Sequence, residues 1–180
     1  VLLHGWLALG DGEYVVRFLS VISGMAGVAL LYALARRVVG DRTALLAALL
    51  LAVSPIHIWH SQDARMYTLL FALAALSSYL LIRALAHSHL LAWLAYGVAA
   101  AAALYTHNTA LFTVAAQMAF AAFYVAVRRR WSMVGGMGLS VAVLGALYVP
   151  WLPAATSQAT HLQQYFWICL LYTSPSPRDR

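Results

Sequence analysis

Two ionisable side chains, Asp63 and Arg65, stand two residues apart in the segment 54–67, which reads Ser-Pro-Ile-His-Ile-Trp-His-Ser-Gln-Asp-Ala-Arg-Met-Tyr. Long apolar stretches flank this segment on both sides. A guanidinium presents a fork of N–H donors that can bind a phosphate through two hydrogen bonds. A neighbouring carboxylate can hold that guanidinium in place or act on a hydroxyl group. The alternative is a structural ion pair or a contact with lipid headgroups.

Two histidines accompany this pair. His57, His60 and Asp63 are spaced i, i+3, i+6, so a helix would place them around one side, where two or three could bind a divalent metal ion. Pro55 predicts that a helix ends or restarts in this segment, which works against a continuous face. The alternative interpretation is a pair of interfacial histidines without a metal.

His107 occupies a second break between apolar stretches, within the run Tyr-Thr-His-Asn. A histidine there is a candidate for binding an anionic substrate or a metal ion. The alternative is a turn residue that caps the next helix together with Asn108.

The composition indicates an integral membrane protein. Of 180 residues, 64% are hydrophobic and only 9% are charged, whereas a soluble domain has about 25% charged residues. Eleven arginines against five acids, with no lysine, give a formal charge of +6. The arginines occupy short gaps between apolar runs instead of one amphipathic face, so orientation in a membrane explains them better than nucleic-acid binding. The single cysteine, Cys169, excludes a disulfide within the chain.

Six apolar stretches are long enough to span a bilayer, which takes about 17–25 residues. Alanine and leucine dominate them and strand-like alternation is absent, so we predict an all-α fold, a polytopic transmembrane helix bundle of about six spans. The predicted spans are 18–39, 43–59, 66–86, 90–106, 109–127 and 133–152.

Antiparallel spans would gather seven arginines on one side of the membrane, leaving Arg17 and Arg65 on the other. The positive-inside rule makes the seven-arginine side cytoplasmic. We therefore predict that Asp63, Arg65 and the histidines near them face the extracytoplasmic side of a bacterial inner membrane. The seven are Arg36, Arg37, Arg42, Arg83, Arg128, Arg129 and Arg130.

We interpret residues 1–167 as one partial membrane domain. The chain begins with neither Met nor a basic signal region, so we interpret its start as the interior of a longer protein. Residues 168–180 differ in character from what precedes them, and we interpret them as a foreign or disordered tail that carries no function.

Several short motifs resemble the bacterial multi-pass glycosyltransferases of the C-type membrane fold, the family 39-like relatives of protein mannosyltransferases and aminoarabinose lipid A transferases. They are Arg-Phe-Leu-Ser at 17–20, Ala-Arg-Arg at 35–37, Ser-Pro-x-His-Ile at 54–58, Ser-Gln-Asp-Ala-Arg-Met-Tyr at 61–67 and Tyr-Thr-His at 105–107. The motif at 61–67 is the most specific of them. The resemblance covers about residues 1–167.

The resemblance implies an inverting transfer of a sugar from a polyprenyl-phosphate carrier to a protein, lipid or glycan acceptor at the extracytoplasmic face. It implies that Arg65, Tyr67, His107 and Arg17 bind the donor phosphate, with Asp63 assisting. The main catalytic carboxylate of the family would precede Val1, so we expect the 180 residues alone to be inactive. A divalent metal remains an open cofactor, with His57 and His60 as its candidate ligands.

Three alternatives belong to other classes. A multi-pass transporter or channel would place charged groups or broken helices near mid-span, where this chain has mostly Ala, Leu, Val and Gly. An intramembrane serine protease could use Ser20 or Ser23, but no histidine lies mid-span to activate either hydroxyl. A structural subunit would leave the Asp63–Arg65 cluster without a role.

Overall fold

The computed structural model describes residues 13–63, 65–154 and 156–157 of the chain, and every regular element within them is a helix. The predicted all-α helix bundle is thus confirmed, while the tail at 168–180 lies outside the described residues. The elements are α2 (Glu13–Val39), α3 (Asp41–Ala52), α4 (Pro55–Gln62), α5 (Tyr67–His87), α6 (Leu90–Thr106), α7 (Ala110–Val127), η2 (Trp131–Met133), α8 (Val134–Tyr148) and η3 (Val149–Trp151).

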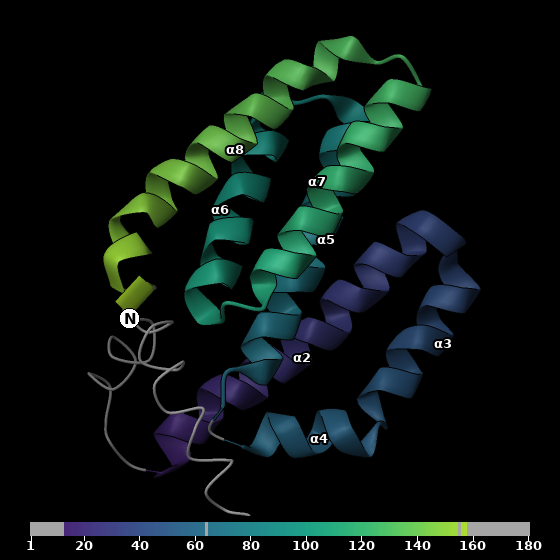
Figure 1. The fold of residues 1–180 in the computed structure, drawn as a ribbon. Helices are drawn as coiled ribbons and strands as arrows, with labels where there is room; N and C mark the ends of the chain where they lie inside the picture. Colours follow the sequence, from purple (N-terminus) through teal and green to yellow (C-terminus); the bar gives the residue numbers. More distant parts are fainter. Residues whose placement is uncertain (1–12, 64, 155, 158–180) are drawn as a thin grey trace, which may run out of the picture.

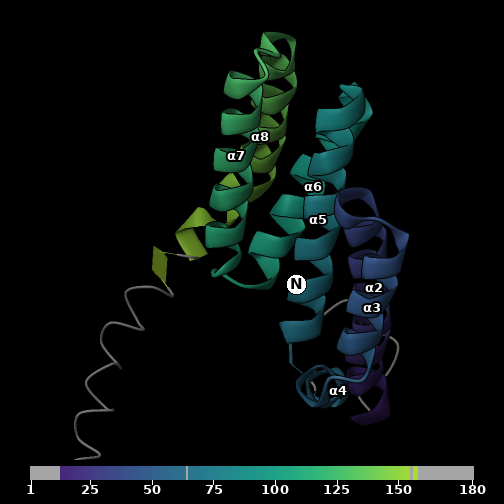
Figure 2. The same ribbon diagram turned by 90° about the vertical axis from the view of Figure 1, so that its right-hand side faces the viewer.

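Helix α5 lies in the middle of the bundle, with α2 along one side and α6 along the other (Figures 1 and 2). Helix α3 packs on the outside of α2, α8 packs on α6, and α7 lies beside α5 and α6. Consecutive long helices run antiparallel because the turns between them are short. The starts of α2 and α5 therefore share one end of the bundle with α4, and the ends of α5 and α7 share the other (Figure 1).

Four helical segments are long and apolar enough to cross a membrane. They match four of the predicted spans to within a few residues at each boundary. Helix α6 matches a fifth, but at 17 residues it is shorter than the others and is the most enclosed by its neighbours. The four segments are Arg17–Val39, Tyr67–His87, Ala110–Val127 and Trp131–Ala154.

The predicted span at 43–59 is wrong as a single helix. The chain breaks there into α3 and α4, which are bent by 57° relative to each other. Ser54 is extended, with φ −67° and ψ 121°, because Pro55 disfavours a helical conformation in the residue before it. With 12 residues, α3 is only about 18 Å long at 1.5 Å per residue, too short to cross the hydrocarbon core by itself.

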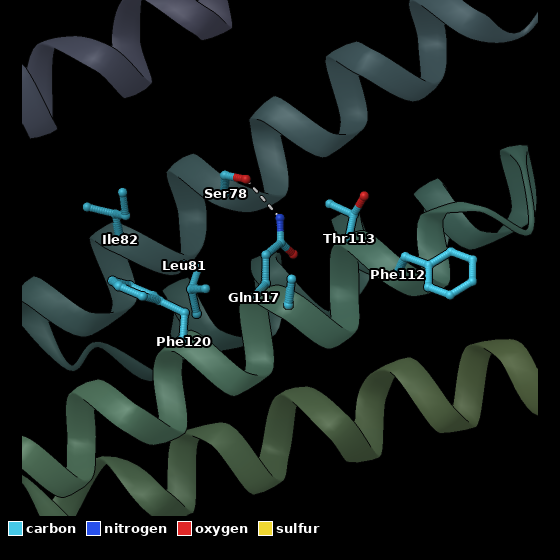
Figure 3. A pocket seen from close by; sticks show the side chains of 8 residues that line it. Ser78, Leu81, Ile82, Phe112, Thr113, Gln117 and Phe120 are labelled. Carbon is cyan, nitrogen blue, oxygen red and sulfur yellow. Dashed lines mark hydrogen bonds between the residues drawn. The ribbon is translucent and has the colours of Figure 1, made fainter.

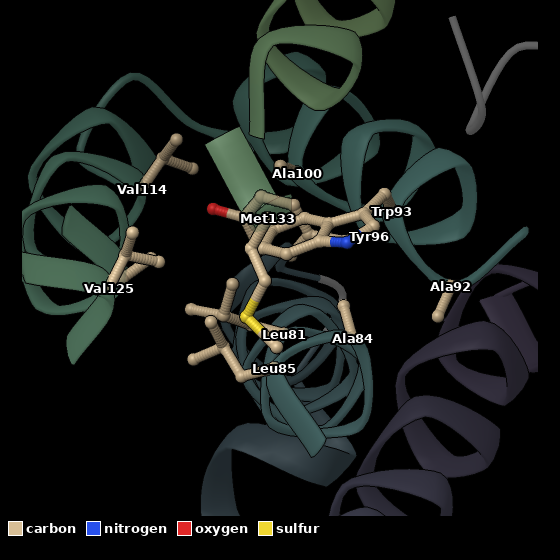
Figure 4. Close-up of a cluster of buried hydrophobic side chains, with 11 residues drawn as sticks. Leu81, Ala84, Leu85, Ala92, Trp93, Tyr96, Ala100, Val114, Val125 and Met133 are labelled. Carbon is tan, nitrogen blue, oxygen red and sulfur yellow. The ribbon is translucent and has the colours of Figure 1, made fainter. Parts of the chain in front are cut away.

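The core of the bundle forms where α5, α6 and α7 meet (Figure 4). Its largest fully buried side chains are Trp93 and Tyr96 of α6 and Met133 of η2. The phenol of Tyr96 does not enter hydrocarbon unpaired, because it donates a hydrogen bond to Gln117 Oε1 at 3.1 Å. Gln117 Nε2 in turn donates to the hydroxyls of Ser77 and Ser78 at 2.9 and 2.8 Å. This network joins three helices and satisfies each member, as an apolar surrounding requires.

Small residues let α6 and α8 approach closely. A Cβ added to Gly97 would lie 2.8 Å from the carbonyl oxygen of Ser140, and one added to Gly136 would lie 2.4 Å from the Trp93 ring. Ser140 Oγ donates to the backbone oxygen of Trp93 at 2.9 Å across the same contact. Packing and a buried hydrogen bond therefore hold α8 to α6, as is typical of membrane helix pairs.

We predict that Gly97→Ala destabilises the bundle by about 1–3 kcal/mol, because the new methyl group meets backbone that cannot rotate away. Gly138→Ala in α8 is the matched control, since a Cβ there meets nothing within 4 Å. The control should leave stability unchanged or raise it slightly through helix propensity. Thermal unfolding of both variants in the same detergent tests this, and an equal effect of the two would contradict the close contact.

Candidate functional site

The corner between α4 and α5 brings the predicted site residues together. Helix α4 lies across one end of the bundle, and residues 63–66 connect it to the start of α5 (Figure 1). Asp63 caps the end of α4 in an extended conformation, with φ −88° and ψ 139°, and Met66 precedes the first turn of α5. The connection is too short to move far from either helix.

Asp63 and Arg65 form an ion pair across this corner. Asp63 Oδ2 lies 3.1 Å from Arg65 Nε, with side chains 33% and 62% exposed, respectively. The backbone oxygen of Arg65 accepts a hydrogen bond from Ser20 Oγ of α2 at 3.3 Å. The main chain of Arg65 is thus held against α2, whereas its guanidinium extends into an accessible region at the end of the bundle.

His57 fixes α4 onto α2. Its Nε2 lies 3.2 Å from the carbonyl oxygen of Gly24, and because a carbonyl only accepts, Nε2 must carry the proton. Ser61 Oγ donates to the backbone oxygen of His57 at 2.7 Å. A Cβ added to Gly24 would lie 2.3 Å from Ser61 Oγ, so only glycine lets the two helices approach this far.

His60 faces α5 instead of α2. Its ring lies between those of Trp59 and Tyr67, with centroids 5.0 Å away on each side. Its Nδ1 is buried without a hydrogen-bond partner, and so is the hydroxyl of Thr68 in the first turn of α5. These are the two buried side-chain polar atoms left unpaired within the described part of the chain. Buried unpaired atoms are uncommon and point to a missing water or ligand.

The metal ligands suggested by the sequence do not converge. In the part of the chain that the structure describes, no three His, Cys, Asp or Glu side chains lie close enough to share a metal ion. His57 and His60 both belong to α4, as their spacing predicts, but they contact different neighbouring helices. Asp63 lies just beyond the end of that helix.

His107 ends α6 and caps the start of α7. Its Nδ1 accepts a hydrogen bond from the backbone N–H of Thr109 at 3.1 Å and lies 2.8 Å from the hydroxyl of the same residue. This is the capping role that the sequence left open as an alternative. Among the described residues, its hydrogen bonds stay within the turn between α6 and α7 and do not reach Asp63 or Arg65.

Arg17 lies one turn before Ser20 on α2, and its side chain is exposed. Residues 17, 20 and 24 are spaced i, i+3, i+7 and share one side of the helix. That side carries the contacts to Arg65 and to α4 described above. Arg17 is therefore placed on the same side of α2 as the corner that holds the ion pair.

Sequence reasoning treated Ser20 and Gly24 only as small packing residues. The structure gives them a positioning role as well, since they contact Arg65 and α4. Their four-residue spacing, one turn after Arg17, was the available signal. Their partners lie more than thirty residues away, so the sequence could not name them.

A separate groove of about 570 Å³ opens between α5 and α7 (Figure 3). Its walls are mostly apolar, and its polar floor is the Gln117–Ser78 hydrogen bond, whose groups satisfy each other. It holds none of the predicted site residues. The lining residues are Ser78, Leu81, Ile82, Phe112, Thr113, Ala116, Gln117 and Phe120.

The fold and this corner define a multi-pass membrane protein with a polar site at one end of its bundle. Residues 2–153 match the family model described as dolichyl-phosphate-mannose-protein mannosyltransferase. The chain therefore belongs to the dolichyl-phosphate-mannose-protein mannosyltransferase family, and its class is membrane glycosyltransferase. This confirms the resemblance inferred from the motifs. No curated protein and no solved structure matches the chain.

We predict that Gly24→Ala lowers the stability of the bundle by about 1–3 kcal/mol, because the methyl group overlaps Ser61. The double variant Gly24→Ala/Ser61→Gly returns the space that the methyl group takes and should recover part of the loss. Thermal unfolding measures both. If the single variant is as stable as the parent chain, α4 does not pack as closely on α2 as described.

Proposed function

We propose that the Asp63–Arg65 corner is the donor-phosphate site of a glycosyltransferase that moves a sugar from a polyprenyl-phosphate carrier to an acceptor. The observation that carries this proposal is the exposed guanidinium of Arg65, whose backbone is held by Ser20 while its side chain pairs only with Asp63 among the described residues. A guanidinium with a fixed base and a mobile tip suits a phosphate that arrives with its lipid. Family membership supports the same reaction class.

The reaction couples one bond that forms to one that breaks. A hydroxyl oxygen of the acceptor attacks the anomeric carbon of the sugar, and the bond from that carbon to the phosphate oxygen breaks. The polyprenyl phosphate leaves with the bonding electron pair, and the hydroxyl proton passes to a carboxylate. Arg65 stabilises the negative charge that grows on the leaving phosphate.

Asp63 assists in this scheme by orienting Arg65. While no phosphate is bound, its carboxylate neutralises the guanidinium and holds it at the corner. A dianionic phosphate competes for the same donors and is a stronger acceptor than a single carboxylate. Tyr67 and Arg17 flank the corner from α5 and α2, and we propose both as further phosphate contacts. His107 is a weaker candidate for that role because its Nδ1 already caps α7.

We predict that Arg65→Ala weakens binding of a polyprenyl phosphate by at least tenfold, because a charge-assisted, two-point contact is lost. Arg65→Lys should restore only part of the affinity, since an ammonium lacks the planar fork. Arg42→Gln, at the other end of the bundle, is the control and should bind as the parent chain does. Titration of the purified 180-residue chain in lipid nanodiscs measures this without requiring turnover. Unchanged affinity in Arg65→Ala would refute the site.

We also propose that this corner faces the extracytoplasmic side and that the opposite, arginine-rich end faces the cytoplasm. The support is the count of arginines at the two ends, which the positive-inside rule converts into an orientation.

Cysteine labelling tests the orientation. In a Cys169→Ser background, we predict that Gln62→Cys reacts with a membrane-impermeant maleimide in intact cells, because position 62 is exposed at the corner. Thr43→Cys, exposed at the start of α3, is the matched control and should react only after the cells are opened. The reverse pattern would invert the topology and separate the corner from a donor on the outer face.

A further inference from the structure

We infer that the turn between α7 and η2 is a binding site for the headgroup of an anionic phospholipid. The turn reads Arg128-Arg129-Arg130-Trp131 and lies at the arginine-rich end of the bundle, opposite the Asp63–Arg65 corner (Figure 1). This inference is independent of the proposed function, because it concerns other residues and a lipid that is not a substrate.

The protein itself uses several arginines at this end. Arg36 pairs with Asp41, the one acidic residue that the described chain has there. Arg37 lies over the Tyr79 ring at 4.8 Å and donates to its hydroxyl at 3.2 Å. Arg130 donates from Nη1 to the backbone oxygen of Leu85 at 3.1 Å.

The Arg130 hydrogen bond brings the turn against the end of α5. Leu85 belongs to the last turn of that helix, whose carbonyl groups carry partial negative charge and lack partners within the helix. Arg130 satisfies one of them. Arg128 and Arg129 are exposed beside it, and no side-chain hydrogen bond or ion pair is found for either within the described residues. Two guanidinium groups are thus left at the membrane boundary without a protein anion.

The backbone of Arg129 indicates that its side chain has a use. It adopts the left-handed conformation, with φ 52°, at the position after a helix where glycine is normally found. The N–H of Arg130 bonds to the Val125 oxygen at 3.0 Å, which closes the turn around it. An arginine costs more than glycine in that conformation. Retaining a guanidinium there requires a compensating contact.

The surroundings favour a lipid over a soluble anion. Phe123 and Val127 on α7 are spaced one turn apart and are 67% and 61% exposed, and Trp131 follows the arginines at 66%. An apolar strip therefore leads along the helix to the two arginines, with a tryptophan at the level where membrane proteins place them. A phosphodiester with acyl chains matches both parts, because its phosphate meets the guanidinium groups while its chains follow the strip.

Affinity for phosphatidylglycerol tests the site. We predict that Arg128→Gln/Arg129→Gln lowers the affinity of the full chain for phosphatidylglycerol, measured by native mass spectrometry, roughly ten- to thirty-fold. The matched control Arg36→Gln/Arg42→Gln removes the same charge from the turn between α2 and α3 and should change the affinity less than threefold. Phosphatidylcholine binding should be similar in all variants. An equal loss in both double variants, or no loss in either, would overturn the site.

Two further arms make the result specific. Arg129→Gly should raise the thermal midpoint in lipid-free detergent, because glycine suits the left-handed conformation, yet lower phosphatidylglycerol affinity about fivefold. Unchanged affinity in that variant would overturn the assignment. Water-soluble glycerol phosphate should fail to displace the lipid, since it cannot use the apolar strip. Displacement at similar concentrations would show a free phosphate site and would also overturn it.

Discussion

The contact between α2 and α4 at Gly24 is the constraint on which the polar corner depends. Helix α4 is only eight residues long and has no buried side chain of its own, so it cannot hold its position through apolar packing. Its place is set by the His57–Gly24 hydrogen bond and by the space beside Gly24 that Ser61 occupies. The direction in which α4 leaves α3 follows from that contact, and so does the position of Asp63 at its end.

A hydrocarbon environment explains why these contacts are polar. Backbone carbonyls and hydroxyl groups at membrane depth find no water, so each must be paired within the protein. Ser20, Ser23 and Ser61 all donate to backbone oxygens, two of them to the oxygen four residues earlier on their own helix. Within the bundle, the network around Gln117 follows the same rule. These mid-span polar groups satisfy one another and include no charge, which distinguishes them from the substrate path of a transporter.

Much of this architecture could be predicted from the sequence, and its failures have a common cause. Span boundaries follow from apolar length, and the Asp63–Arg65 pair follows from two-residue spacing on a short connection. The segment 43–59 was misjudged because its composition is uniformly apolar, and hydropathy does not register that Pro55 breaks the backbone. The contacts of Ser20 and Gly24 could not be predicted, since they join residues that are distant in sequence. His107 showed both of its possible roles in sequence, and only the geometry of Thr109 separates them.

The two ends of the bundle use arginine differently, and the difference lies in what each guanidinium contacts. At the far end, Arg37 and Arg130 bond to neutral protein groups on a neighbouring helix, so they contribute to helix packing. At the corner, the backbone of Arg65 is anchored to another helix while its guanidinium meets only Asp63. An exposed ion pair of this kind is worth about 0–1 kcal/mol, so exchanging the carboxylate for a phosphate costs little stability. A residue held by its main chain and weakly held by its side chain can bind and release an anion without disturbing the fold. That property separates Arg65 from the other arginines of the chain more clearly than charge or exposure does.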